Sequence, residues 1–485
     1  MRLIPAAAMT LQIVAVLLAG DPVPACSGLG GVVPRGRTIP VERPILSKIG
    51  PHKLAPVSGT HRLVAILASY SNVQAATSPT VWAQQIFGTS DSLRAYYREV
   101  SYGRFTVAPA AESSGAANDG IVSVTLTGLT HPWTRWGDGW EWEGMHSQTV
   151  AAEILTAANP YINFATFDAN GDSVITYDEL HLYLIIAGRE DSYGQSSKPA
   201  AWRHRWTLTA PLVLDGVTVG TGARGGYLTT GEVKPDDVSP LPFGLAAHEL
   251  GHDLGLPDLY DTTPLDGPDS EGVGEWGLMG SGDWLGTTPN AANRPAHLCA
   301  WSKMDLGWLT PQTVTTATIG LLRRGEDNAD CYIVYPHFAA SGSEYFLLEN
   351  RQRVGFDAGL VNSGPAHGLL IYHVDEAVIA ANRAANTVND DEAHKGIDVE
   401  CADAPTSGHV VNADALDAGA NRGDAGDPWS AGRKTLFGLM GKSVPDSRLY
   451  SGEDSGIVIY GISASGPVMT FNAGMAAEVT RFRLD

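Results

Sequence analysis

The stretch LPFGLAAHELGHDLGLPD, residues 241–258, holds the pattern from which the fold and chemistry of the chain can be worked out. Pro242 suits the first turn of a helix and Gly255 suits its C-terminal end, so the stretch predicts a helix between them. His248 and His252 are four residues apart and therefore share one face of that helix, about one turn from each other. Both imidazoles can then reach a single metal ion.

Glu249 directly follows the first histidine. Its displacement by one position keeps the carboxylate away from the metal's ligands and beside the water that the ion activates, where a general base is needed. A zinc ion with three protein ligands keeps a fourth position for that water and lowers its pKa to about 7. The pattern H-E-x-x-H therefore predicts a catalytic zinc site. The alternative is an amphipathic helix with exposed histidines.

The residues after the helix favour the zinc site. Gly255 can end the helix in a left-handed conformation and turn the chain back, and Asp258 comes three residues later. The aspartate stands where the long metzincin motif has a third histidine, and a carboxylate oxygen is an acceptable zinc ligand. We therefore predict Asp258 as the third ligand. The competing or supporting groups nearby are Asp253, Tyr260 and Asp261.

Met279 lies in GVGEWGLMGSGDW, a stretch bracketed by glycines. A single methionine is most often part of the core packing. Here its place downstream of the helix motif predicts a methionine turn that passes beneath the metal.

The chain resembles a known family on these residues. HELGHDLGLPDLYD followed by EWGLMGSGDW is similar to the immune inhibitor A family of secreted bacterial metallopeptidases. Further similar segments come in the same order between about residues 60 and 475: SLRAYYREVSYGRF, FDANGDSVITYDEL, RPAHLCAWSKMDLGWL, EYFLLENRQRVGFDAGL, GLLIYHVDE and NRGDAGDPW. The resemblance implies a zinc-dependent endopeptidase of metzincin type. It carries over His248 and His252 as zinc ligands, Glu249 as the base, Asp258 as the third ligand and Met279 as the turn.

One departure from the metzincin pattern affects the oxyanion. Some metzincins carry a tyrosine two residues after the methionine as a donor to the transition state, but position 281 is Ser. The group that stabilises the oxyanion is therefore open between Tyr260, His204 and the metal itself.

The segment DANGDSVITYDE, residues 168–179, is nearly a calcium-binding loop. The oxygen donors at its positions one, three, five, nine and twelve are Asp168, Asn170, Asp172, Thr176 and Glu179. Position six, where a sharp turn calls for glycine, is Ser173, and the apolar run after the loop is typical of a strand. An Asx-rich turn without an ion is the alternative. We predict structural calcium because these oxygens are costly to pack together unneutralised, and the family resemblance implies it too.

Charge and the N-terminus bear on partners and localisation. The formal net charge of −21 argues against a nucleic-acid partner, because phosphates would be repelled and no local basic patch appears. We expect protein or peptide substrates instead. An arginine, an apolar run and small residues predict a secretory signal peptide over residues 1–26, and hence a secreted, extracellular protein with no stable membrane span. Lipoprotein anchoring at Cys26 is the less favoured alternative.

The rest of the chain divides into regions that differ in composition and hydrophobic pattern. Residues 27–60 are rich in proline and glycine and predict a linker or short pro-segment. In 61–310, buried-strand patterns alternate with helix patterns, which predicts an α/β (α+β) metzincin-like catalytic domain. In 311–485, runs such as CYIVYP, GLLIYHVD and GIVIYGIS lie between turn residues and predict a mostly β C-terminal region. Its role is open between a substrate-binding module and a wall of the cleft.

The remaining cysteines are Cys299, Cys331 and Cys401. In an oxidising exterior, one disulfide with one thiol left over is the simplest arrangement, and the pairing is not written in the sequence. The alternative is that all of them are small buried apolar residues.

These observations predict a secreted zinc endopeptidase that hydrolyses peptide bonds of proteins with Glu249 as general base. The first rival is a surface binding or adhesion protein on an inactive peptidase scaffold. Such a protein would have lost a ligand or the base, and this chain has lost neither. The second rival is an amidase that acts on cell-wall material.

Overall fold

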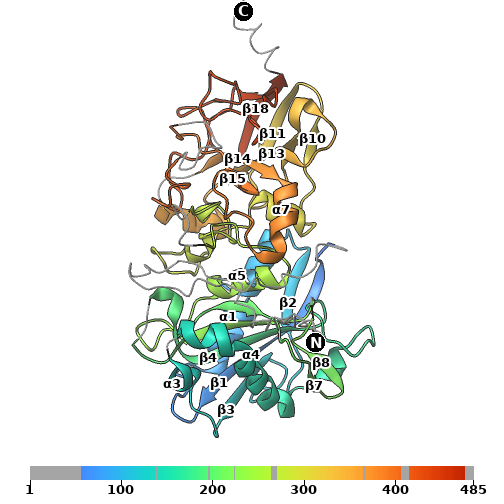
Figure 1. Ribbon diagram of the computed structural model, residues 1–485, viewed down its shortest axis with the longest axis vertical. Helices are drawn as coiled ribbons and strands as arrows, with labels where there is room; N and C mark the ends of the chain where they lie inside the picture. The colour runs from blue at the N-terminus through green and yellow to red at the C-terminus, as the bar shows by residue number, and fades with distance from the viewer. Residues whose placement is uncertain are drawn as a thin grey trace, which may run out of the picture.

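The computed structural model describes residues 56–475, apart from 138, 195–196, 223, 264–269, 364–366 and 406–413. The expected signal peptide, Cys26 and nearly all of the 27–60 segment lie outside the described residues. The protein is a mixed α/β molecule with several sheets and few helices (Figure 1). The predicted α/β class is confirmed at this level.

The largest sheet forms the base of the N-terminal part. Its path runs β2-β1-β4-β9-β6, with β3 also pairing with β1 and β5 also pairing with β4. The strands are β1 (Gly59–Tyr70), β2 (Phe105–Pro109), β3 (Ile121–Leu126), β4 (His181–Glu190), β5 (Ala200–Ala201), β6 (His204–Trp206) and β9 (Tyr227–Val233). β1 runs parallel to β2, β3 and β4, whereas β6 runs antiparallel to β9. Strands of a parallel sheet are buried on both faces, which explains the nearly continuous apolar runs of β1 and β4.

Helices cover both faces of this sheet. Successive side chains of β1 point to opposite faces, so each face receives its own set. Leu63, Ala65 and Leu67 pack in one core cluster with α1 (Pro79–Phe87), α2 (Leu93–Val100) and α5 (Phe243–Asp253). Val64, Ile66 and Ala68 pack in another with α4 (Gly139–Ala158), next to the short α3 (Pro132–Trp136). The helix predicted from the H-E-x-x-H stretch is α5, and it packs on one face of the sheet.

The C-terminal part is built mainly from two sheets. The first runs β10-β12-β13-β14-β15 and the second runs β11-β18-β17-β16. The first sheet comprises β10 (Gln312–Val314), β12 (Tyr332–Val334), β13 (Glu344–Arg351), β14 (Gly368–Asp375) and β15 (Ile397–Val399). The second comprises β11 (Thr318–Arg323), β16 (Leu436–Phe437), β17 (Ile457–Tyr460) and β18 (Val468–Met475). A separate core cluster joins the two sheets.

The remaining strands and α-helices are short. They are the hairpin of β7 (Leu212–Leu214) with β8 (Val217–Val219), and the helices α6 (Ala300–Asp305) and α7 (Glu376–Asn382). In Figure 1, α5 lies between the N-terminal sheet and the C-terminal sheets. The α5 core cluster accordingly contains side chains from both sides of residue 310, including Trp308, Leu347 and Tyr372. The C-terminal sheets therefore pack directly on the layer that carries the predicted site.

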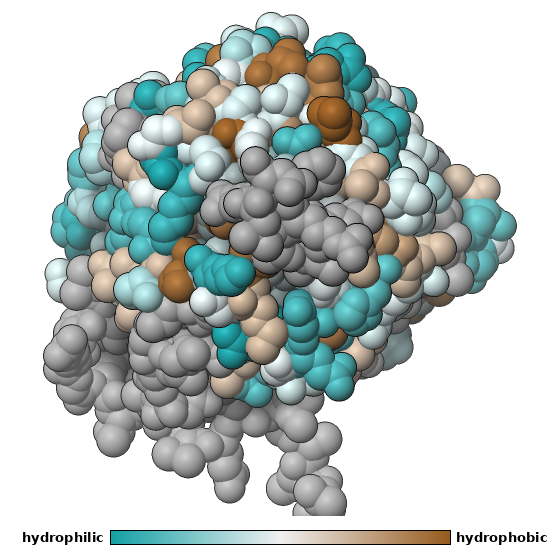
Figure 2. Space-filling view, turned by 90° about the horizontal axis from the view of Figure 1, so that it is seen from above, coloured by the Kyte–Doolittle hydropathy of each residue, from teal (hydrophilic) through white to brown (hydrophobic). Residues whose placement is uncertain are grey.

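The outer surface of the C-terminal sheets is only patchily hydrophobic. Seen from above, hydrophobic side chains form small separate patches among hydrophilic ones (Figure 2). Ile319 and Leu321 on β11 are exposed, while Leu322 between the sheets is buried, as expected of a strand with one solvated face. Among the described residues no helix is both long and apolar enough to cross a bilayer.

The prediction of a disulfide among Cys299, Cys331 and Cys401 is wrong. Cys299, Cys331 and Cys401 are all buried and free. They behave as small apolar core residues, which is the alternative that the sequence left open.

Candidate metal centre and active site

The end of α5 creates the turn that brings the third predicted ligand back to the helix. α5 ends at Asp253, and Gly255 then has a φ of 100°, a left-handed conformation that suits glycine. The backbone N–H of Leu256 donates to the carbonyl of Gly251 over 3.0 Å, which closes the helix end. The chain therefore folds back toward its own last turns, as the spacing of Gly255 and Asp258 predicts.

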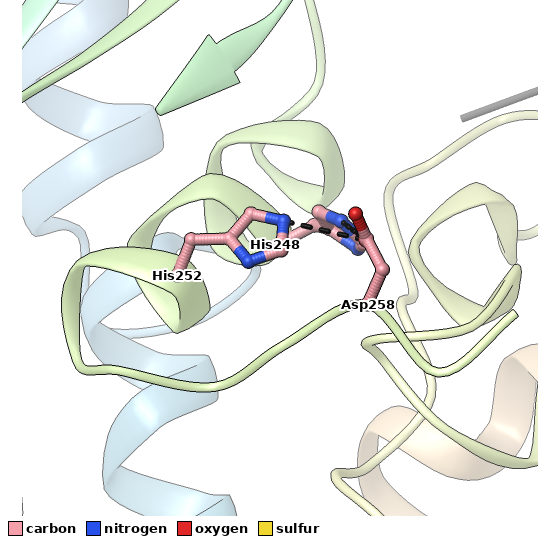
Figure 3. Close-up of side chains that lie close together, drawn as sticks. All are labelled: His248, His252 and Asp258. Atoms are coloured by element: carbon pink, nitrogen blue, oxygen red, sulfur yellow. Dashed lines mark hydrogen bonds and ion pairs between the residues drawn. The ribbon is translucent and has the colours of Figure 1, made fainter. Parts of the chain in front are cut away.

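The structure brings His248, His252 and Asp258 together. Asp258 Oδ1 lies 3.0 Å from His248 Nε2 and 3.3 Å from His252 Nε2. Ligand atoms of all three side chains lie within 4.8 Å of one another, and all three residues are fully buried. Figure 3 shows the carboxylate on the returning chain facing both imidazoles on the helix. We call these three residues the triad.

Backbone carbonyls fix the histidines of the triad. His248 Nδ1 lies 2.8 Å from the carbonyl oxygen of Leu278, and His252 Nδ1 lies 2.8 Å from that of Leu256. A carbonyl oxygen only accepts, so each Nδ1 carries a hydrogen, and in the neutral imidazole each Nε2 then presents a lone pair. Two nitrogen lone pairs and a carboxylate oxygen then converge on one point. That donor set fits a zinc ion, since a cation removes the repulsion between the lone pairs.

The pKa of Asp258 favours its ionised form, which is the form that binds a metal. Burial raises the pKa of the Asp258 carboxyl, but His252 and His248 more than reverse this, so the pKa lies well below its ordinary value. Burial lowers the pKa of His248, and Asp258 raises it above the usual range. The carboxylate is therefore ionised at neutral pH, as a metal ligand must be.

Glu249 lies beside the triad with an unsatisfied carboxylate. The residue is fully buried, and among the described residues neither of its carboxylate oxygens has a hydrogen-bond partner. Burial raises the pKa of Glu249, while His248 and Arg203 oppose that rise. A buried charge without hydrogen bonds is costly, so such a group in a native site calls for a role.

Arg203 lies near this base, and no pattern in the sequence pointed to it. Its Nε lies 3.9 Å from Glu249 Oε1, and its Nη1 donates to the buried carboxylate of Asp283. Arg203 precedes β6, and its backbone N–H donates to Glu190 over 3.1 Å. The buried Arg203 guanidinium thus lies between the carboxylates of Asp283 and Glu249.

His204 points away from the site, which corrects one of the predicted oxyanion donors. Its Nε2 lies 2.5 Å from Ser147 Oγ and its Nδ1 lies 2.9 Å from the carbonyl of Trp202. Neighbouring residues of a strand point to opposite faces of the sheet. Because the Arg203 side chain points toward α5, the His204 side chain points toward α4. Burial lowers the pKa of His204 to about 4. Tyr260 and the metal are therefore the remaining candidates for stabilising the oxyanion.

Residues 78–309 match the family model described as immune inhibitor A peptidase M6, catalytic domain. The match contains the triad, Glu249 and Met279. Over residues 78–309 the chain is therefore similar to the catalytic domain of the immune inhibitor A peptidase M6 family.

Two relatives of the M6 domain are metallopeptidases by name or family. Pre-pro-metalloprotease PrtV of Vibrio cholerae serotype O1 is 30% identical over 233 residues, which is 44% of this chain and 23% of that protein. Immune inhibitor A of Bacillus thuringiensis subsp. alesti is 37% identical over 144 residues, which is 26% of this chain and 20% of that protein. The matched part therefore spans less than a quarter of the length of either curated relative.

Solved structures give only a distant likeness. Two crystal structures of OgpA from Akkermansia muciniphila, the wild type and an inactive form with an O-glycopeptide, each cover 61% of this chain and 73% of their own. Identity is 16% and 13%, with TM-scores of 0.28 and 0.26. Scores this low do not establish a common fold.

In the M6 domain, Met279 lies under α5. A Cβ added to Gly251 would come within 2.5 Å of the Met279 sulfur, so the glycine makes room for that side chain. The Leu259 N–H donates to the Met279 carbonyl over 2.8 Å, and the preceding carbonyl, that of Leu278, holds His248. The methionine stretch thus contacts the helix, the returning chain and one ligand.

The groups that competed for the third-ligand role lie elsewhere. Asp253 lies 2.6 Å from His181 Nδ1 and 3.0 Å from Arg205 Nε, on the sheet side of α5. Asp261 accepts from the N–H of Thr263 over 2.7 Å. Neither carboxylate belongs to the triad's cluster. Asp258 is therefore the carboxylate that the fold brings to the two histidines.

The 168–179 loop has a different character. Asp168 accepts from the backbone N–H groups of Gly171, Asp172 and Ser173 at 2.8, 3.2 and 3.0 Å. Ser173 has a φ of 63°, so it adopts the left-handed turn expected at position six without glycine. The following residues, His181–Glu190, form a strand as predicted.

The predicted calcium ligands do not form a cluster like the triad. In the described parts of the chain, two sets of at least three His, Cys, Asp or Glu bring ligand atoms within 4.8 Å. One is the triad and the other is Asp403, Asp424 and Asp427. Calcium at residues 168–179 stays a prediction.

Proposed function

We propose that the protein is a secreted, zinc-dependent endopeptidase of metzincin type that hydrolyses peptide bonds of proteins. The observation that carries the proposal is the convergence of His248 Nε2, His252 Nε2 and Asp258 Oδ1, with both Nδ1 atoms committed to backbone carbonyls. The M6 match and the metalloprotease relatives support the same class of reaction.

The three members of the triad would hold the zinc ion. When bound, zinc supplies a Lewis acid that polarises the scissile carbonyl and makes a water acidic enough to attack at neutral pH. The carbonyls of Leu278 and Leu256 keep the imidazoles in the tautomer and orientation that this role requires.

Glu249 would act as the general base and then as the general acid. Its carboxylate takes a proton from the attacking water, and the protonated carboxyl gives that proton to the leaving amine. The absence of hydrogen-bond partners at its oxygens among the described residues supports this role, because both oxygens stay open to the proton. Arg203 opposes the effect of burial on the pKa of Glu249 and so favours the ionised base.

The remaining parts of the proposal concern the oxyanion, calcium and localisation. Tyr260, on the same turn as Asp258, is the remaining side-chain candidate for the oxyanion. Calcium at residues 168–179 would stabilise that loop. The name pre-pro-metalloprotease of one relative supports a signal at 1–26 and a pro-segment within 27–60. We retain 61–310 as the catalytic domain and 311–485 as the β-rich region, which would form a wall of the site.

Replacement of Glu249 by Gln tests this function. Glu249→Gln keeps the size of the side chain and the zinc but removes the base, so we expect casein cleavage to fall by about 10²–10⁴-fold. Glu153→Gln on α4 is the matched control, because α4 packs on the opposite face of the sheet. Full cleavage by Glu249→Gln would refute the mechanism. Cleavage of peptidoglycan but not casein by the wild type would favour the amidase.

A further inference from the structure

The carboxylate of Asp258 is held by a residue far along the chain. Asn386 Nδ2 donates to Asp258 Oδ2 over 2.6 Å. In return, the backbone N–H of Asp258 donates to Asn386 Oδ1 over 2.8 Å. The two residues are 128 positions apart, and Asn386 lies beyond the M6 match. One side-chain amide thus grips both the carboxylate and the backbone of the third ligand.

The two contacts leave the other carboxylate oxygen directed at the histidines. Oδ2 accepts from Asn386, while Oδ1 faces Nε2 of His248 and of His252. Donation to one oxygen fixes the rotation of the carboxylate about its Cβ–Cγ bond. An outer hydrogen bond of this kind orients a ligand before the metal arrives.

Asn386 occupies a position that suits asparagine. Its φ is 58°, a left-handed conformation that asparagine tolerates better than most residues, and it is 7% exposed. It follows the short 3-10 turn Arg383–Ala385 after α7, and its N–H donates to the Arg383 carbonyl over 3.1 Å. The backbone there is set by the turn, and the side chain is aimed at Asp258.

The segment around Asn386 is docked on the turn that carries Asp258. Arg383 donates to the carbonyl of Gly255 over 2.5 Å and pairs with Asp305 at 2.7 Å. Asn389 Nδ2 donates to the carbonyls of Leu259 and Ile397 over 3.0 and 2.8 Å. These bonds hold both ends of the returning chain without touching the carboxylate.

The Thr262 side of the turn is docked as well. Thr262 N–H donates to Asp390 Oδ1 over 2.8 Å, and its hydroxyl donates to the carbonyl of Asn386 over 3.1 Å. The segment from Arg383 to Asp390 therefore follows the ligand turn along its length. We call this segment the strap.

We propose that Asn386 is a positioning residue for the zinc ligand Asp258, delivered by the strap from the C-terminal part of the chain. The inference rests on the proposed zinc site and goes beyond it, because the metal centre is then incomplete within residues 78–309. The C-terminal sheets contribute to zinc affinity, and a chain truncated near residue 310 would bind zinc weakly even if it folded.

Zinc affinity measured on the full chain tests the proposal. The variant Asn386→Gly removes the amide and keeps a backbone that adopts positive φ without strain. Asn389→Ala is the matched control, because it removes another buried strap asparagine that holds the same turn but not the carboxylate. Protein stripped of metal is titrated with zinc against a chelating indicator, and the melting temperature of each metal-free variant is recorded.

We expect Asn386→Gly to weaken zinc binding by about 10–100-fold, the usual effect of losing an outer partner of a ligand. Asn389→Ala should lower the metal-free melting temperature and leave the zinc dissociation constant within about twofold of the wild type, since it leaves the first ligands and their orientation intact. In an Asp258→Ala background, Asn386→Gly should have no further effect on zinc affinity.

Three results would overturn the proposal. They are wild-type zinc affinity in Asn386→Gly, equal weakening by Asn389→Ala, and full additivity of Asn386→Gly with Asp258→Ala. The same variants separate this inference from the proposed function. If Asp258→Ala alone leaves zinc affinity unchanged, the ligand assignment fails; if Asp258→Ala weakens binding and Asn386→Gly does not, only the strap's role fails.

Discussion

The triad and the 168–179 loop are both dense in metal-ligating residue types, but the fold treats them in opposite ways. The triad is fully buried, and its ligand atoms face one another. Half of the residues in the loop are exposed, and its carboxylates accept hydrogen bonds from the loop's own backbone. Glu179, for example, accepts from the backbone N–H groups of Ala169 and Thr176 at 2.9 and 3.0 Å.

The difference lies in where the partners of each ligand come from. In the triad, carbonyls from α5's own C-terminal turn and the methionine stretch hold the histidines, and Asn386 holds the aspartate. Each of these partners binds the outer atom of its ligand and directs the inner atom at the centre of the triad. In the loop, local Asx turns satisfy the oxygens that calcium would take. In the proposed metal centre an ion completes the triad, whereas the loop is a complete turn to which an ion could be added.

The largest contrast is expected in zinc binding. Asp258→Ala removes one of the three proposed protein ligands, so its zinc affinity should fall by more than the about 100-fold that an outer partner costs. Asp168→Ala removes the loop's first acidic residue and should leave one zinc per chain. Elemental analysis after dialysis checks both. Loss of zinc from Asp168→Ala would mean that the loop, rather than the triad, is the zinc site.

The next contrast concerns the charges beside each region. Arg203 pairs with buried Asp283 near Glu249, so Arg203→Leu leaves buried carboxylates without a cation and should cost about 3–5 kcal/mol in free energy of unfolding. Arg224 makes an exposed pair with Asp178 of the loop, and Arg224→Leu should cost only about 0–1 kcal/mol.

Denaturant unfolding of the two variants measures these free energies. Equal losses of unfolding free energy in the two variants would show that the buried Arg203 pair stabilises the protein no more than the exposed Arg224 pair. A stable Arg203→Leu variant with full peptidase activity would also remove the reason to think that this cation assists Glu249.

The last and smallest of the three contrasts concerns calcium at the loop. If calcium binds there, 100-fold excess over its dissociation constant stabilises the protein by about 2.7 kcal/mol. The melting temperature of the wild type should then rise in calcium relative to EGTA, and Asp168→Ala should abolish the rise. No rise in the wild type would leave the loop as the Asx-rich turn without an ion.

Local patterns in the sequence predicted the parts of the site that are close in the chain. Pro242, the histidine spacing, Gly255 and Asp258 define a helix, its end and a returning carboxylate within one short stretch. Helix geometry and one glycine turn determine how these residues meet, so no long-range information is needed. The buried strands of the large sheet were also recognisable, because parallel strands carry continuous apolar runs.

The residues that the sequence did not reveal reach the site from distant segments. Asn386 lies 128 positions from Asp258, and an isolated asparagine carries no pattern. Arg203 and His204 are neighbours in the chain, and only the strand's orientation decides which one faces α5. His204 was one of three open candidates for the oxyanion donor, and this orientation removes it from them. The disulfide arithmetic failed because a cysteine count says nothing about which thiols come within bonding distance.

Whether the triad holds one zinc ion can be seen in a crystal structure with anomalous data collected above and below the zinc edge. We expect one zinc peak bonded to His248 Nε2, His252 Nε2 and Asp258 Oδ1, at about 2.0–2.2 Å from each. A zinc peak elsewhere, or one at the two histidines with Asp258 turned away from it, would refute the proposed metal centre.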